Sequence, residues 1–259
     1  MRAAFAAIAA VLLSGCGAKP LRVCADPNNL PFSNQAGQGL ENRLAERIAR
    51  DLGRPLEYVW WAQRRGFMRN TIGKGTCDIW PGVAAGLESV ATTRPYYRAS
   101  YVFVTRRADR LGGLTLDDPR LRHLKLGVQL VGDDGSNTPP AHALSRRGIT
   151  GNVRGYMLYG DYRRPNPPAA IVDAVAAREI DAGLVWGPLA AYFAARSKVP
   201  LRTEAVTPWL DDQQWPMAFD ISVGVRRDDP ALLVAINRIL AKDHDAVARL
   251  LTQYGLEPS

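Results

Sequence analysis

The sequence predicts an α/β protein of two lobes, each built on a mostly parallel sheet that helices flank. Two observations carry this prediction. Buried strand-like runs alternate with amphipathic helical runs, and the alternation occurs in two successive series, one ending near residue 105 and one beginning near residue 124. Such alternation is typical of parallel sheets covered on both faces. The 259 residues are enough for two lobes of this kind.

The first series contains short apolar or β-branched runs and two helical patterns. The predicted strands are residues 21–24, 56–60, 77–81 and 101–105. A helical spacing places Leu44, Ile48 and Leu52 on one face. A second helix is predicted from Phe67 to near Gly75, because glycine commonly ends helices.

The second series follows the same logic. Its predicted strands are residues 124–128, 182–185 and 221–225. Helices are expected to start at Pro167 and at Gly187, and Asp229 followed by proline predicts the N-cap of a long amphipathic helix. A last short helix is expected to end before Gly255. Polar and glycine-bearing loops follow these strands, and ligands of open α/β sheets bind at the carboxyl ends of strands.

The first fifteen residues, 1–15, are predicted to be a secretion signal. Arg2 supplies the positive start, and the apolar run that follows is too short to span a bilayer. The run ends in Leu-Ser-Gly-Cys, which resembles a bacterial lipobox, so we expect a lipid on Cys16 that tethers the protein to a membrane of a Gram-negative periplasm. Ordinary signal cleavage near this point is the alternative.

Cysteine usage fits an oxidising compartment. Beyond Cys16, only Cys24 and Cys77 remain, and an even pair of this kind suggests one disulfide. Two buried free thiols are the alternative. The three histidines are scattered, and no metal-ligand spacing is present, so no metal or cofactor is predicted.

The net charge is +8, and arginine pairs recur at 64–65, 106–107, 146–147, 163–164 and 226–227. Nucleic acid is not an expected partner, because the pairs are dispersed and the protein is exported. Either the arginines form a solvated surface, or one face attracts an acidic protein or anionic lipid headgroups.

Four segments resemble a known family of proteins. They are CADPNNLPFSN at 24–34, YVWWAQRRGFMRN at 58–70, TTRPYYRASYVFVT at 92–105 and IDAGLVWGP at 180–188. Together they resemble type II periplasmic solute-binding proteins, and in particular the quinoprotein dehydrogenase-associated branch of the MxaJ/XoxJ type. The first two segments are specific to that branch, whereas the last is ordinary for the wider superfamily. The similarity covers nearly the whole mature chain.

The resemblance implies a clamshell with two crossing strands as a hinge. Lobe one would comprise residues 16–103 plus 222–259, and lobe two residues 104–221. It also implies a non-catalytic accessory or maturation partner of a PQQ-dependent quinoprotein alcohol dehydrogenase, as found beside methanol dehydrogenases. A receptor that serves an ABC permease and a dehydratase-like enzyme are the alternatives.

The sequence departs from the amino-acid-binding members in one respect. Those members carry an arginine before the Pro-Tyr pair, which grips a ligand carboxylate, whereas residues 84–89 here read AAGLES. Without a guanidinium a carboxylate loses its bidentate partner, and Glu88 would repel it. Arg94 is a possible substitute, although its position fits a structural ion pair equally well. Amino-acid uptake is therefore not expected.

Residues at the ends of the predicted strands are the candidates for a ligand- or partner-binding cleft. From lobe one they are Asp26, Asn28, Asn29, Phe32, Trp61, Gln63, Arg64, Arg65, Trp80, Gly82, Tyr96 and Tyr97. From lobe two they are Gln129, Asp134, Asn137, Asp181, Trp186 and Gly187. Rings with a few polar anchors suit a flat ligand or an inserted segment of a partner.

Several of these candidates have a structural alternative. Asp26, Asn28 and Asn29 are also typical of turns, the two tyrosines are typical of a core, and Asp181 could precede its strand as a turn residue. No catalytic residues are predicted. No nucleophile elbow is present, and the adjacent carboxylates at 133–134 and 211–212 have the pattern of solvated turns.

Overall fold

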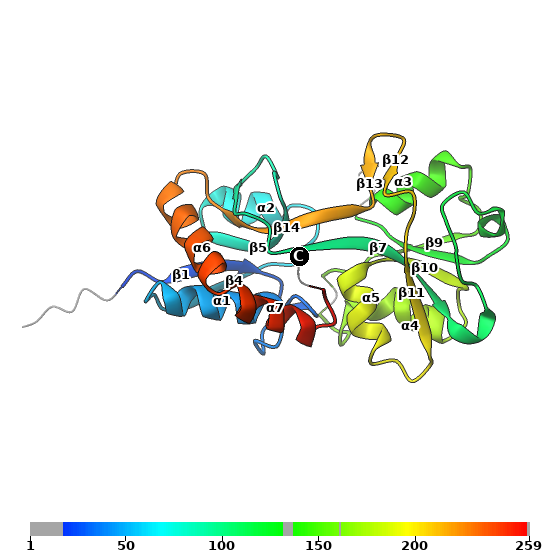
Figure 1. The fold of residues 1–259 in the computed structure, drawn as a ribbon, viewed down its shortest axis with the longest axis horizontal. Coiled ribbons are helices and arrows are strands. Elements are labelled where there is room, and N and C mark those ends of the chain that lie inside the picture. The colour runs from blue at the N-terminus through cyan, green and yellow to red at the C-terminus, as the bar shows by residue number, and fades with distance from the viewer. Residues whose placement is uncertain (1–17, 132–136, 161, 258–259) are drawn as a thin grey trace, which may run out of the picture.

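The computed structural model describes residues 18–131, 137–160 and 162–257. It shows two α/β lobes that lie side by side and are joined by two long strands, β7 (Tyr97–Arg106) and β14 (Ala218–Val225) (Figure 1). The predicted leader, residues 1–15, and the proposed lipid site at Cys16 lie outside the described residues.

The sheet of lobe one is built mostly from strands that the sequence predicts. It contains β1 (Leu21–Ala25), β4 (Leu56–Trp60), β5 (Ile79–Ala84) and the short β6 (Ala91–Thr92). Strand β1 lies between β4 and β5 and pairs with both in parallel. Strand β14 then pairs antiparallel with β5.

Lobe two repeats this plan on the other side of the long strands. Its strands are β8 (Leu126–Gln129), β9 (Val153–Tyr156), β10 (Ala182–Trp186) and β11 (Leu201–Ala205). The first three pair in parallel, whereas β10 and β11 pair antiparallel with β7. The path through the whole sheet is β4-β1-β5-β14-β7-β10-β8-β9.

Strands β7 and β14 make the crossing between the lobes. The first part of β7 pairs with β14, up to Ser100 opposite Ala218, and from Tyr101 onward β7 pairs with β10. One strand therefore belongs to both halves of the sheet, and its neighbour returns beside it (Figure 1). This confirms the two-lobed fold with a two-strand connection.

Helices cover both halves. Lobe one carries α1 (Leu40–Asp51), α2 (Phe67–Asn70), α6 (Pro230–Lys242) and α7 (His244–Gln253), and lobe two carries α3 (Pro139–Arg146), α4 (Ala170–Ala176) and α5 (Gly187–Ala194). The C-terminal helices return to lobe one, because Ile236 and Leu251 pack in the same buried cluster as Val23 and Leu44. The predicted N-cap is confirmed: the Asp229 side chain accepts a hydrogen bond from Leu232 N at 3.0 Å.

One predicted helix is wrong in extent. The segment from Phe67 to Gly75 is not continuous, because α2 stops at Asn70 and a separate 3₁₀ turn covers Ile72–Lys74. Between them Thr71 leaves the helical region, at φ −120° and ψ −99°, and its buried hydroxyl donates to Phe67 O at 2.7 Å. The short pairs β2–β3 (Asn28–Asn29, Ser33–Asn34) and β12–β13 (Leu210–Asp211, Trp215–Pro216) were not predicted.

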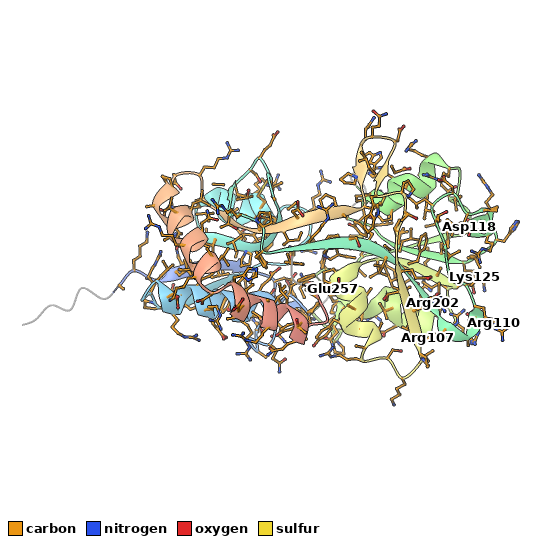
Figure 2. The ribbon with its side chains drawn as sticks, viewed as in Figure 1. Arg107, Arg110, Asp118, Lys125, Arg202 and Glu257 are labelled. Atoms are coloured by element: carbon orange, nitrogen blue, oxygen red, sulfur yellow. A yellow bond between two sulfur atoms is a disulfide. The ribbon has the colours of Figure 1, made fainter. Side chains whose placement is uncertain are left out.

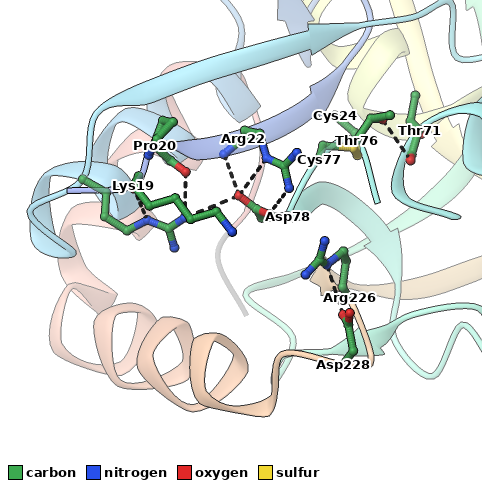
Figure 3. A network of polar contacts seen from close by, with 11 residues as sticks. Lys19, Pro20, Arg22, Cys24, Thr71, Thr76, Cys77, Asp78, Arg226 and Asp228 are labelled. Atoms are coloured by element: carbon green, nitrogen blue, oxygen red, sulfur yellow. Dashed lines mark hydrogen bonds and ion pairs between the residues drawn. A yellow bond between two sulfur atoms is a disulfide. The ribbon is translucent and has the colours of Figure 1, made fainter. Parts of the chain in front are cut away.

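The predicted disulfide is present between Cys24 and Cys77. Their Cα atoms lie 5.5 Å apart, within the range that a disulfide spans. Figure 3 shows the polar network beside it, in which the Asp78 carboxylate meets Arg22 at 2.7 Å and Arg54 at 3.4 Å. Burial raises the pKa of Asp78, but the hydrogen bonds and charges of these arginines outweigh it, and the net pKa is lowered.

Candidate functional site

A cavity of about 270 Å³ lies between the two lobes. It is lined by Gly82, Ala84, Tyr101, Gln129, Val131, Thr138, Tyr159, Trp186, Phe219 and Ile221. Most of these residues come from the ends of β5, β8 and β10 and from the crossing strands, while Val131, Thr138 and Tyr159 come from loops of lobe two. The cavity thus opens where open α/β sheets bind ligands. Three predicted cleft residues, Gly82, Gln129 and Trp186, line it.

Aromatic rings form much of the cavity wall. Trp186 packs edge-to-face on Tyr101 at 5.1 Å and on Phe219 at 6.0 Å between ring centroids. Burial raises the pKa of Tyr159 to about 12, even though Gln129 hydrogen-bonds its hydroxyl. Among the described residues, no lysine or arginine lines this cavity. It offers rings, amides and hydroxyls to a ligand, and no cation to a carboxylate.

Asp26 anchors the loop that follows β1. Its carboxylate accepts hydrogen bonds from Gln63 N at 2.6 Å and Asn28 N at 2.8 Å. Burial nevertheless raises the pKa of Asp26, with these two bonds opposing the shift. Asp26 therefore fastens the loop after β1 to the loop after β4, which is the turn-building role that the sequence left open.

The same loop reaches lobe two. The Asn28 side chain donates to Arg164 O at 2.9 Å, and Phe32 is buried in the lobe-two cluster that contains Val104 and Ile171. Asn29 donates to Gln63 Oε1 at 2.8 Å, while its own buried side-chain oxygen has no hydrogen-bond partner among the described residues. The CADPNNLPFS segment thus closes one side of the interlobe space.

A buried carboxylate that sequence reasoning missed lies behind the cavity wall. Glu41, in the first turn of α1, is only 6% exposed, and a Cβ atom at Gly82 would fall 2.0 Å from its Oε1. Burial, reinforced by the nearby Asp26 charge, raises the pKa of Glu41 to about 8. Helical spacing in the sequence could have indicated this burial, since position 41 lies on the same apolar face as Leu44 and Ile48.

Three predicted lobe-one residues, Trp61, Arg64 and Arg65, are exposed, and Arg64 lies where the lobes meet. Trp61 is 43% exposed, and Arg64 lies against Gly160 of lobe two, where a Cβ atom would be 3.2 Å from Arg64 Cδ. Arg65 is exposed beside them. Tyr162 of lobe two is 53% exposed; partial burial raises its pKa, the Asp26 charge adds to the shift and the Arg64 charge opposes it.

Other predicted residues lie away from the cavity. Tyr96 and Tyr97 are buried in the lobe-one core, in the same cluster as Val23 and Leu44. Trp80 does not line the cavity and packs on Phe67, with 4.9 Å between ring centroids. Gly187 has no room for a side chain, since a Cβ atom would lie 2.5 Å from Ser100 O.

The lobe-two candidates divide in the same way. Asp181 accepts from Lys125 N at 2.8 Å and meets Arg106 at 3.4 Å, so its carboxylate serves the base of its strand and not the cavity. The Asn137 side chain accepts from Val131 N at 3.4 Å. Asp134 lies outside the described residues.

Within the described residues, no group of three or more histidine, cysteine, aspartate or glutamate side chains is placed to hold a metal ion. A search of the same residues finds no helix with the length and apolar character needed to cross a membrane.

Comparison with known proteins identifies relatives over nearly the whole chain. Protein MoxJ of Methylorubrum extorquens is 34% identical over 248 residues, which is 91% of this chain and 80% of the relative. The crystal structure of periplasmic binding protein XoxJ from Methylobacterium extorquens AM1 superposes with a TM-score of 0.72 and 32% identity, over 92% of this chain and 99% of that one. MxaJ from Methylophaga aminisulfidivorans gives a TM-score of 0.75 and 25% identity, over 92% and 100%.

The family model for bacterial extracellular solute-binding proteins, family 3, matches residues 21–257. The two lobes, the crossing strands and the interlobe cavity agree with this match. The chain belongs to the bacterial extracellular solute-binding proteins of family 3.

Proposed function

We propose that this protein is a non-catalytic periplasmic accessory that docks on a quinoprotein alcohol dehydrogenase and assists its maturation. Its relatives MoxJ, XoxJ and MxaJ support this proposal, together with the segments that resemble the dehydrogenase-associated branch. The proposal includes the lobe boundaries 16–103 plus 222–259 and 104–221, cleavage of the leader after residue 15, and a lipid on Cys16.

The interlobe cavity is the observation that carries the proposal. Its described lining contains no cationic side chain, and Arg94, the possible substitute, is exposed beside α6 and not at the cavity. An amino acid bound here would leave its carboxylate without a charged donor, which costs much of its affinity. At about 270 Å³ the cavity is also smaller than the roughly 300–1,000 Å³ usual for small-molecule sites.

The edge where the lobes meet supplies a docking surface, which we call the rim patch: Trp61, Arg64 and Tyr162. Trp61 is 43% and Tyr162 53% exposed, and Arg64 is also exposed. Tryptophan, tyrosine and arginine are the side chains that most often dominate the binding energy of protein interfaces. Because the patch contains residues of both lobes, a partner bound there would sense how far the lobes are closed.

A solute receptor for an ABC permease is the second candidate. The observation in its favour is that a cavity lies between the two lobes, where a receptor of this fold binds its ligand. The two functions separate in one experiment. An accessory binds the purified dehydrogenase and shows no thermal shift with a library of small solutes, whereas a receptor gives the reverse result.

A further inference from the structure

Helices α1 and α7 pack side by side on lobe one and leave a hollow of about 330 Å³ between them (Figure 1). On α1, Arg43, Arg47 and Arg50 follow at intervals of four and three residues, which places them on one face. Arg249 faces them from α7. We call this hollow the arginine groove; its lining is Arg43, Glu46, Arg47, Arg50, Ala246, Arg249, Leu250, Gln253 and Tyr254.

The positive charge of the arginine groove is only partly balanced. Arg43 pairs with Glu46 at 3.1 Å, and Arg47 pairs with Asp243 at 2.9 Å. Arg50 and Arg249 are exposed, and neither side chain forms an ion pair or hydrogen bond with a described residue. The lining thus holds four guanidinium groups and a single carboxylate.

Such a stripe is unfavourable for the helix itself, because like charges three or four residues apart repel. Some arginines elsewhere are matched: at the outer end of lobe two, Arg202 meets Glu204 at 3.5 Å and Arg107 donates to Leu201 O at 3.1 Å (Figure 2). The surface charge is therefore unevenly distributed, and the arginine groove carries more positive than negative charge.

The arginine groove also has an apolar floor and a defined end. Ala246 and Leu250 lie between the charged side chains. At one end the Tyr254 hydroxyl donates to Gln38 O at 2.5 Å, and its ring stacks on Tyr192 of α5, with 6.1 Å between centroids. The end of the groove therefore touches lobe two.

We propose that the arginine groove binds an acidic segment of a partner protein. A guanidinium matches a carboxylate with two parallel hydrogen bonds, and two unpaired guanidiniums on opposite walls can hold carboxylates along one extended chain. The guanidiniums line a hollow between two helices, which admits a peptide segment more readily than the flat surface of a bilayer. Naming the quinoprotein dehydrogenase as the source of the segment rests on the proposed function.

The groove is tested with a fluorescently labelled octaglutamate peptide, whose binding is measured by anisotropy at about 0.15 M ionic strength, where the Debye length is about 8 Å. The Arg50→Glu/Arg249→Glu variant is expected to bind the peptide at least about 10-fold more weakly than the parent protein. The matched control is Arg69→Glu/Arg227→Glu, which makes the same charge change at exposed positions of lobe one outside the groove. The control is expected to stay within about 2-fold, because exposed charges a Debye length apart are screened.

The inference is overturned if both variants lose affinity for octaglutamate to the same extent, or if both bind it as tightly as the parent protein. A different result would favour a membrane surface and also overturn the inference. In that result the parent protein binds anionic phospholipid vesicles but not octaglutamate, and Arg50→Glu/Arg249→Glu no longer binds the vesicles. Repeating the measurement with the purified dehydrogenase separates the two proposals. If the groove variant binds the enzyme as the parent does, the groove is not its docking site, whereas no binding by the parent defeats the proposed function.

Discussion

The Asn28 side-chain amide donates to the backbone oxygen of Arg164 at 2.9 Å and so joins the two lobes directly. A few residues away, Phe32 is buried in the lobe-two core, and Tyr254 stacks on Tyr192 at another contact between the lobes. The contact between the lobes is thus held by the burial of Phe32 and by weaker polar and aromatic contacts. This ranking makes the first prediction.

Phe32→Ala is expected to loosen the contact between the lobes and to lower the free energy of unfolding by about 3–5 kcal/mol, because it removes a buried ring. Asn28→Ala is the comparison and is expected to cost only about 1 kcal/mol, as one hydrogen bond does. Small-angle scattering should show a larger radius of gyration for Phe32→Ala. Similar effects of the two substitutions would contradict the ranking.

Glu41 predicts how stability depends on pH. Its pKa is raised to about 8 in the folded state, so between its unfolded value of 4.5 and about 8 the folded protein keeps a proton that the unfolded chain has lost. The free energy of unfolding should therefore fall as the pH rises through this range. Glutamine cannot lose a proton, so Glu41→Gln should flatten this fall. At pH 8 its free energy of unfolding should exceed that of the parent protein by at least about 1 kcal/mol.

The matched control for Glu41 is Glu88→Gln at an exposed position, which should leave the slope as it is in the parent protein. Chemical unfolding measured at several pH values between about 5 and 8 provides the comparison. Burial also raises the pKa of Asp26, which is still present in Glu41→Gln. The free energy of unfolding of this variant should therefore still fall with pH, but less steeply than in the parent protein. An identical slope in the parent and in Glu41→Gln would show that Glu41 is not the titrating group.

The disulfide is expected to stabilise lobe one. Cys24 and Cys77 are 53 residues apart, and loop-closure entropy predicts a loss of about 4 kcal/mol when the bond is removed. The measurement is urea unfolding of Cys24→Ala/Cys77→Ala beside the oxidised parent. Adding a reductant should leave the free energy of unfolding of the double variant unchanged. If the double variant is less than about 1 kcal/mol less stable than the oxidised parent, this account is contradicted.

The rim patch is tested with alanine substitutions. Trp61→Ala and Tyr162→Ala are each expected to weaken binding of the dehydrogenase by about 2 kcal/mol, which is the size of effect seen at interface hot spots. Trp209→Ala removes a tryptophan of similar exposure outside the patch, 52% against 43% for Trp61, and serves as the control. Isothermal titration of the enzyme with each variant gives the affinities. Loss of binding in Trp209→Ala alone would move the docking surface to that part of lobe two.

Local patterns predicted most of the fold. Alternating apolar runs located β4 at its observed bounds and α6 behind its Asp229 cap, because burial and capping act within a few residues. Thr71, which divides the predicted helix after Phe67, was missed because the local pattern marks neither its non-helical backbone nor its complete burial.

The site was harder to predict, because its lining depends on which strand ends meet across the lobes. Gly82, Gln129 and Trp186 follow the rule of carboxyl ends, whereas Tyr101 lines the cavity from the middle of β7 and Phe219 from the start of β14. Tyr96 and Tyr97 share the sequence features of cleft residues but pack in the lobe-one core. Sequence position alone does not tell which side of the sheet such a ring faces.

Binding of the purified quinoprotein alcohol dehydrogenase, measured by isothermal titration at physiological ionic strength, tests the central claim most directly. The account predicts a specific complex with a dissociation constant in the micromolar range or below, and no heat when the common amino acids are titrated instead. Absence of a complex, together with saturable binding of an amino acid in the interlobe cavity, would contradict it and identify the protein as a solute receptor.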